Sequence, residues 1–192
     1  MKHLFLRRAA LAASLAVAGA AAQAAPFVVD AFANSSTGGV GAATIALTMG
    51  QSFSVNVDPG DLWNAGALPR WSNADGLTGN LFATGSDDSL QPVGTLIGAD
   101  FGIHNQAGLA APFGTLVGQI GAGSFFAIGT SFNGIASATG TLNLYYWDSN
   151  FGDNTEFITA DVRVNAIPEP QTYALMLAGL GLLGFMARRR GR

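Results

Sequence analysis

Residues 144–161, LYYWDSNFGDNTEFITAD, indicate the fold of this chain because a strand, a polar loop and a second strand follow one another directly. Apolar and polar side chains alternate through residues 141–146 and again through residues 157–164. This period of two is typical of strands that bury one face. We therefore expect residues 157–164 to be the return strand.

The loop between these strands is crowded with side-chain oxygen atoms. Calcium binds six to eight oxygens from carboxylates, amides and carbonyls, whereas Asp, Asn and Gly also build ordinary turns. The loop is therefore either a hard-cation site or a solvated hairpin tip. Its polar residues are Asp148, Ser149, Asn150, Asp153, Asn154 and Thr155.

The rest of residues 25–166 has the pattern of an all-β domain. Short β-rich runs alternate with Gly, Asn, Asp and Pro, and no stretch shows a helical period. This predicts one all-β domain, a sandwich or a barrel, with a long loop over residues 67–92. Tight turns are expected at residues 58–61 and at Asn133-Gly134. The other expected strands are residues 44–48, 52–57, 93–98, 113–121 and 124–132.

The charge of this domain excludes nucleic acid as a partner. Eleven acidic residues stand against Arg70 and Arg163, with no Lys, so residues 25–166 carry a formal charge of −9. Nothing there could neutralise a row of phosphates. The chain contains no Cys, so the core must be stable without disulfides.

Residues 1–24 have the three parts of a secretory signal peptide. Lys2, Arg7 and Arg8 precede an apolar run over residues 9–22, and a small-x-small cleavage site follows at residues 22–24. We expect an N-terminal signal helix that directs export. A short transmembrane anchor is the alternative.

The segment at residues 167–192 has its own order of features. An apolar run over residues 173–187 would span only about 22 Å as a helix, less than a comfortable membrane span requires. It lies between a Pro-Glu-Pro triplet and an Arg cluster, which comprise Pro168, Glu169, Pro170, Arg188, Arg189 and Arg190.

This order resembles the PEP-CTERM sorting signal of Gram-negative bacteria. The resemblance implies a hydrophobic C-terminal helix that anchors the chain transiently in the inner membrane. It also implies an exosortase that cleaves near the triplet, after which the protein is at the cell surface or extracellular. A plain C-terminal anchor is the alternative.

Three segments in order resemble the PA-I type of calcium-dependent galactose-binding bacterial lectins. They are VDPGD at residues 57–61, APFGTLVGQIG at residues 111–121 and GTLNLYYWDSNFGDN at residues 140–154. The resemblance implies a small sandwich of two antiparallel sheets, a lectin-like jelly roll. This agrees with the strand pattern described above.

The resemblance also implies a Ca²⁺ site whose coordination shell is completed by sugar hydroxyls. Val57 stands where the family has a Tyr, and the loop is shorter than its counterpart. His104 lies too far along the chain to match the sugar-contacting His of the family. The implied metal ligands are the side chains of Asp148, Asp153 and Asn154 with the carbonyls of Asn150 and Val57, and the implied sugar contacts are Asp148, Trp147 and Asn154.

These observations predict a non-enzymatic, exported Ca²⁺-binding protein that contacts polysaccharide of an extracellular or biofilm matrix. One alternative is a metal-free structural protein of the matrix or envelope. A glycan hydrolase is the third. His104 lacks a nearby nucleophile signature, and Asp87-Asp88 fits a solvated loop better than a carboxylate pair across a groove.

Overall fold

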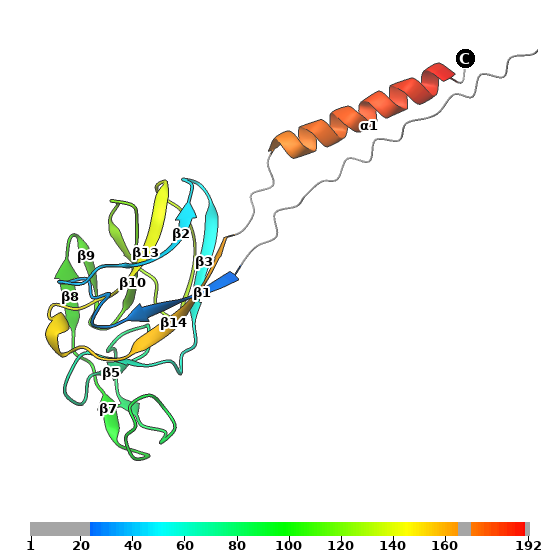
Figure 1. The fold of residues 1–192 in the computed structure, drawn as a ribbon. Coiled ribbons are helices and arrows are strands. Elements are labelled where there is room, and N and C mark those ends of the chain that lie inside the picture. The colour runs from blue at the N-terminus through cyan, green and yellow to red at the C-terminus, as the bar shows by residue number, and fades with distance from the viewer. Residues whose placement is uncertain (1–23, 165–169, 191–192) are drawn as a thin grey trace, which may run out of the picture.

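The computed structural model describes residues 24–164 and 170–190 of the 192-residue chain (Figure 1). The predicted signal peptide, except Ala24, lies outside the described residues, as do Pro168 and Glu169. Helix α1 (Pro170–Arg190) includes the predicted apolar helix and extends beyond it at both ends. Within the described ranges, no helix combines the length and the apolar character that crossing a membrane requires.

Two four-stranded antiparallel sheets form the body of the described chain, so the predicted all-β antiparallel fold is confirmed. The first sheet, sheet A, has the order β1-β14-β3-β12, and the second, sheet B, has the order β11-β10-β13-β2. Sheet A contains β1 (Ala24–Asp30), β14 (Phe157–Val164), β3 (Ser52–Val57) and β12 (Ser131–Ile135). Sheet B contains β11 (Phe125–Ala127), β10 (Leu116–Ile120), β13 (Gly140–Tyr146) and β2 (Ala42–Leu47).

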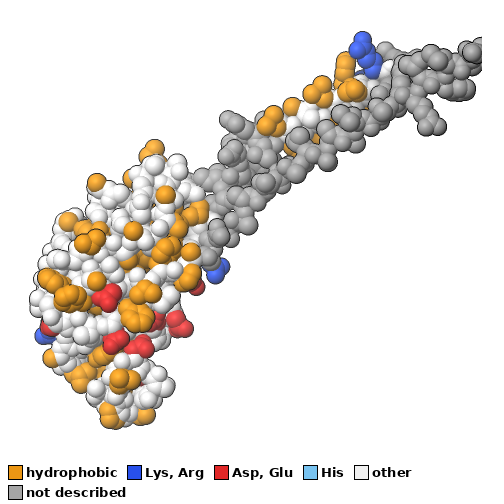
Figure 2. Space-filling view, viewed as in Figure 1, with side chains coloured by type: hydrophobic (Ala, Val, Ile, Leu, Met, Phe, Trp, Pro, Cys, Tyr) orange, Lys and Arg blue, Asp and Glu red, His pale blue; other side chains and the backbone are white. Residues whose placement is uncertain are grey.

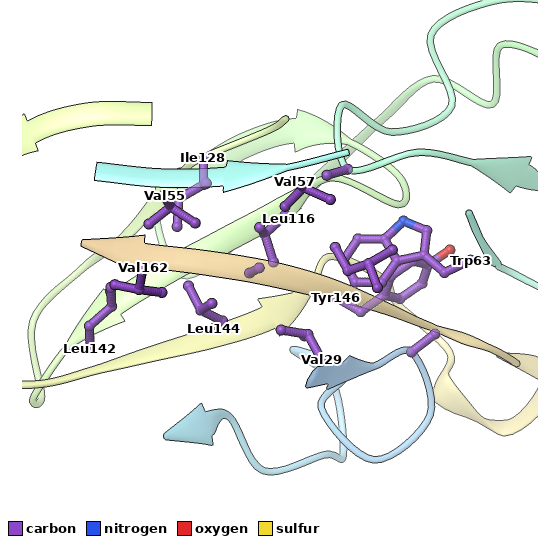
Figure 3. Packing of buried hydrophobic residues seen from close by; sticks show 14 of the residues in the cluster. Val29, Val55, Val57, Trp63, Leu116, Ile128, Leu142, Leu144, Tyr146 and Val162 are labelled. Atoms are coloured by element: carbon purple, nitrogen blue, oxygen red, sulfur yellow. The ribbon is translucent and has the colours of Figure 1, made fainter. Parts of the chain in front are cut away.

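The core lies between the two sheets because each strand turns alternate side chains inward. In β14, Ile158, Ala160 and Val162 are fully buried, while the residues between them are exposed. At one end of the core, the rings of Trp63 and Tyr146 meet edge to face with centroids 4.5 Å apart (Figure 3). Such a pair contributes about 0.5–1.5 kcal/mol beyond its burial.

The strands on either side of the polar loop do not form a hairpin. β13 pairs with β10 and β2 in one sheet, whereas β14 pairs with β1 and β3 in the other. Residues 147–156 therefore cross from one sheet to the other. The alternating pattern shows which face of a strand is buried but does not specify its neighbours.

The region between β3 and β10 folds over the sandwich through three small antiparallel ladders. Its own apolar cluster contains Leu62, Trp71, Ala83 and Ile97. The predicted long loop thus packs against the domain rather than lacking structure. The ladders pair β4 (Trp63–Asn64) with β5 (Trp71–Ser72), β6 (Leu81–Phe82) with β7 (Leu96–Gly98) and β8 (Ile103–Gln106) with β9 (Leu109–Pro112).

Two local predictions were wrong. The single strand expected over residues 124–132 is divided into β11 and β12, because Gly129 has a φ of 69° and its N–H donates to the carbonyl of Leu116. Asn133-Gly134 is not a turn, since both residues pair with β3 inside β12. The ring of Phe132 lies where a Cβ on Gly134 would be, so that glycine provides space for a side chain.

Gly98→Ala tests the packing of the small ladders. A Cβ at position 98 would overlap the backbone carbonyl oxygen of Trp71, which a side-chain rotation cannot relieve. We expect the substitution to lower the free energy of unfolding by about 1–3 kcal/mol in urea denaturation. Gly79→Ala is the matched control because open space surrounds that position. Equal stability of the two variants would contradict this packing.

Candidate functional site

The crossing loop begins directly after β13 and contains one short helical turn. The 3₁₀ turn η1 (Phe151–Asp153) is capped by Asn150, whose Oδ1 accepts a hydrogen bond from the Gly152 N–H at 3.3 Å. The Asn150 side-chain amide also donates to Asp153 Oδ1 at 2.8 Å. Because the turn is fixed by its own polar residues, it holds Asp153 in a defined position.

Asp148 is a buried carboxyl group, with 5% of its surface exposed. Its Oδ1 accepts the Ser149 N–H at 2.7 Å, and its backbone N–H donates to Ser36 Oγ at 3.2 Å. Burial is the largest influence on the pKa of Asp148 and raises it above the ordinary value. Hydrogen bonds from the N–H groups of Ser149 and Asn150 and from the Asn154 side chain lower the pKa in opposition.

Asn154 buries a side-chain oxygen that has no hydrogen-bond partner. The residue is 4% exposed, and its Nδ2 donates to the carbonyl of Ala31 at 3.0 Å. Its Oδ1 is unpartnered. A buried acceptor without a partner costs about 1–3 kcal/mol, and such groups usually have a ligand, an ion or a water beside them.

Asp153 has a cationic neighbour on the region that covers the sandwich. Its Oδ2 lies 3.6 Å from Arg70 Nη1, and both side chains are partly exposed. Arg70 also donates to the carbonyl of Ala65 at 3.4 Å and lies 4.5 Å above the ring of Phe101. Exposed pairs of this kind contribute little stability, so the contact mainly positions the two charges.

The structure brings Asp148, Asp153 and Asn154, three of the predicted ligands, close together in the crossing loop. The Asp153 charge is close enough to Asp148 to raise its pKa further. Two carboxylates and one unpartnered amide oxygen form a donor set of oxygens only, which is the chemistry that a hard cation prefers. The described residues contain no group of three or more His, Cys, Asp or Glu side chains that could hold a metal ion.

Val57 does not fit its predicted role as a ligand. Its N–H donates to the carbonyl of Thr130, and it pairs with Ala160 of β14. Because the N–H and C=O of one strand residue point to the same neighbouring strand, the Val57 carbonyl faces the β12 side. The backbone at Gly66 instead comes so close to Asp153 Oδ2 that a Cβ there would overlap it.

The predicted sugar contact of Trp147 also needs correction. Trp147 is fully buried, and its Nε1–H donates to the carbonyl of His104 at 3.1 Å. Its ring packs edge to face on Phe125 with centroids 5.4 Å apart. A ring enclosed on its faces and bonded at its nitrogen cannot stack on a sugar.

Residues distant in sequence support the loop and could not be recognised from local patterns. Gln106 Nε2 donates to the carbonyl of Ser36 at 2.9 Å, and Ser36 in turn contacts Asp148. His104 lies 3.2 Å from Gln106 Oε1, and its ring centroid is 5.2 Å from that of Trp147. His104 is therefore next to the loop despite its distance along the chain.

Two further unpartnered polar atoms are buried next to Gly114. Tyr146 Oη and Ser72 Oγ both lack partners. The pKa of Tyr146 is raised well above its usual value, first by burial and then by the charges of Asp148 and Asp153. The phenol consequently stays protonated and can donate a hydrogen bond.

Asp148→Asn tests whether this carboxyl group is strained by burial. The folded protein holds the Asp148 proton more tightly than the unfolded chain does, because its pKa is raised on folding. The stabilisation from this proton is complete below the unfolded pKa and is lost as the pH rises through the folded pKa. In metal-free buffer, we therefore expect the unfolding free energy of the native chain to fall relative to that of the variant as the pH rises from the unfolded pKa of Asp148 to its folded pKa.

Urea denaturation from about pH 3 to about pH 7 measures this difference and covers the usual range for Asp. Asp161→Asn is the matched control, since Asp161 is an exposed residue of β14. A constant difference between native chain and Asp148→Asn at every pH would contradict the raised pKa.

Comparison with known proteins identifies one segment of the chain. A solved structure described as "EclA N-terminal domain; PllA-like lectin" is 17% identical, covers 73% of this chain and 95% of its own, and superposes with a TM-score of 0.44. No curated protein sequence matches the chain. The family model of the PEP-CTERM protein-sorting motif matches residues 166–190. The chain therefore carries a PEP-CTERM protein-sorting motif directly after its β-sandwich.

Proposed function

We propose that this protein is a non-enzymatic Ca²⁺-binding protein of the cell envelope or extracellular matrix, and that it contacts extracellular polysaccharide through the bound ion. The PEP-CTERM motif indicates an exported chain that an exosortase sorts and that is anchored in the membrane before cleavage. One observation carries the rest of the proposal. The Asn154 side chain hydrogen-bonds to the buried carboxyl group of Asp148, and its own buried Oδ1 has no partner.

The electrostatics of the loop favour a cation. Asp148 is buried without a cationic hydrogen-bond partner, and Asp153 adds a second negative charge. A bound divalent ion is the largest local charge in such a site and reverses the cost of burying a carboxylate. Asp148, Asp153 and Asn154 would supply protein oxygens, and water or sugar hydroxyls would complete the six to eight that Ca²⁺ takes.

Arg70 supports a second candidate, a metal-free structural protein of the matrix. Its guanidinium group lies 3.6 Å from Asp153 and already supplies a positive charge to this carboxylate. If this contact satisfies the loop, no ion is needed. The two candidates differ in what the removal of Arg70 does, so that variant separates them.

The environment of His104 supports a non-enzymatic role. Its ring stacks on Phe113 at a centroid distance of 5.1 Å, lies against buried Trp147 and contacts Gln106 through Nε2. A general base must reach the proton that it abstracts in a bound substrate. The His104 ring is instead held by its contacts with Phe113, Trp147 and Gln106 next to the crossing loop.

Calcium titration of the full chain in detergent tests the metal site. We expect calorimetry to give a Kd of about 10⁻⁴–10⁻³ M, the range of extracellular Ca²⁺ modules. Asp148→Asn and Asp153→Asn should each weaken binding about tenfold or more, since each removes a charged ligand. Arg70→Gln should strengthen binding because it removes a competing cation.

Asp161→Asn is the control for a general loss of negative charge and should bind Ca²⁺ like the native chain. No heat and no change in melting temperature at millimolar Ca²⁺ would contradict the metal site. If Arg70→Gln lowers stability and Ca²⁺ does not restore it, the metal-free candidate is supported instead.

Polysaccharide binding should depend on the same ion. We expect a glycan array to show binding with Ca²⁺ that a chelator abolishes and that Asp148→Asn lacks, because the sugar hydroxyls would be ligands of the ion. Binding that survives chelation would contradict this mechanism. Turnover of a labelled polysaccharide by the native chain would contradict the non-enzymatic role.

A further inference from the structure

One end of the sandwich gathers the turns next to the sorting motif, and we call it the tail pole. It contains the turns at residues 48–51, 121–124 and 136–139, together with the first residue of β1 and the last of β14. The strand registers place these segments together. The pairs are Ser52 with Ile135, Phe53 with Val164, Leu47 with Gly140, and Ile120 with Leu142.

The tail pole is almost free of charge. Its three turns contain no charged residue, and Arg163 in β14 is the nearest one. Met49 and Ile135 project there with 68% and 70% of their surfaces exposed. The carboxylates on the visible face gather on the half of the domain away from this pole (Figure 2).

The opposite end, which we call the acidic pole, contains the ends of β1 and β3, the crossing loop and the region that covers the sandwich. Asp161 in the middle of β14 is the one acid of the described domain outside these segments. The acidic residues of this pole are Asp30, Asp58, Asp61, Asp75, Asp87, Asp88, Asp100, Asp148, Asp153 and Glu156.

An apolar groove of about 450 Å³ opens at the tail pole between the edge strands β11 and β12. None of the residues that line it is charged. Its floor is formed by aromatic rings that pack on one another. The ring centroids of Phe53 and Phe126 are 6.3 Å apart, and those of Phe126 and Phe132 are 5.3 Å apart. Its apolar lining residues are Phe53, Ile120, Phe125, Phe126, Phe132 and Ile135.

A short segment connects the tail pole to helix α1 of the sorting motif. Helix α1 begins at Pro170, and β14 ends at Val164. Six residues can span at most about 20 Å. Val164 pairs with Phe53, which lines the groove. A membrane that holds α1 is therefore within one short segment of the tail pole.

We propose that the tail pole rests on the lipid bilayer while the chain is anchored, with Met49 and Ile135 in the membrane interface. This inference rests on the anchoring described under the proposed function. Anionic lipids repel the acidic pole, whereas the charge nearest to the tail pole is the cation Arg163. Apolar side chains gain by leaving water at the interface. The Asp148 loop then faces away from the membrane.

Fluorescence quenching on vesicles tests this orientation with the full chain. The chain has no Cys, so Met49→Cys, Ile135→Cys, Val93→Cys and Leu183→Cys each accept one environment-sensitive dye. All four positions are exposed, and Val93 lies in the region at the acidic pole. With a quencher on lipid headgroups and about 20% anionic lipid, we expect quenching about threefold stronger at 49 and 135 than at 93.

The label at position 183, measured with a second quencher on the lipid acyl chains because an anchored helix holds this position in the hydrocarbon, separates this inference from anchoring itself. Quenching at 183 without stronger quenching at 49 and 135 than at 93 overturns the orientation and leaves the anchor intact. No quenching at 183 overturns both. If the emission wavelength of the dye at positions 49 and 135 shifts with protein concentration in the absence of lipid, a second copy of the chain binds this face, and the inference is overturned.

Introducing a negative charge at the tail pole provides a second measurement. With the dye on Ser137→Cys, an exposed residue that lines the groove, Met49→Asp and Ile135→Asp should reduce quenching to the level of Val93→Cys. The matched substitution Val93→Asp should leave it unchanged. Equal effects of the three substitutions would overturn the assignment of the bilayer to this pole.

Discussion

The crossing of the chain from one sheet to the other between β13 and β14 is the constraint on which the polar loop depends. Both strands bury their apolar faces in one core, but they belong to opposite sheets. The loop must therefore pass over one end of the sandwich, where several contacts hold it. Asn154 bonds to Ala31, Thr155 pairs with Asn64, and Ser36 holds Asp148. These contacts bury polar groups that a hairpin tip would leave in water.

Burial gives this loop its chemistry. Asp148 and Asn154 would be unremarkable turn residues in solvent, but in this structure each keeps only a few per cent of its surface exposed. A carboxyl group with a raised pKa and an unpartnered amide oxygen both lower the stability of the empty loop. Arg70 compensates Asp153 from the region that covers the sandwich. The cation affinity that we propose for this loop would thus depend on competition between Arg70 and an ion for Asp153.

The two poles separate the proposed roles of the domain along one axis. Because every main strand runs between the poles, residues a few positions apart in sequence can lie at opposite ends. The acidic pole contains the oxygen-rich loop, and the tail pole adjoins the sorting motif with apolar, uncharged turns. A domain of this polarity can face a bilayer and a matrix at the same time.

Local patterns in the sequence determined the β class, the presence of a strand at residues 157–164, the position of Asp148, Asp153 and Asn154 in one loop, and the sorting motif. Each depends on neighbours in the chain, such as a period of two or a fixed order of residues. Tertiary structure alone decided that β13 and β14 lie in different sheets. It also buried Trp147 and brought His104 beside it. Pairing partners and close approaches between distant segments follow from packing of the whole core, which alternation in one strand does not encode.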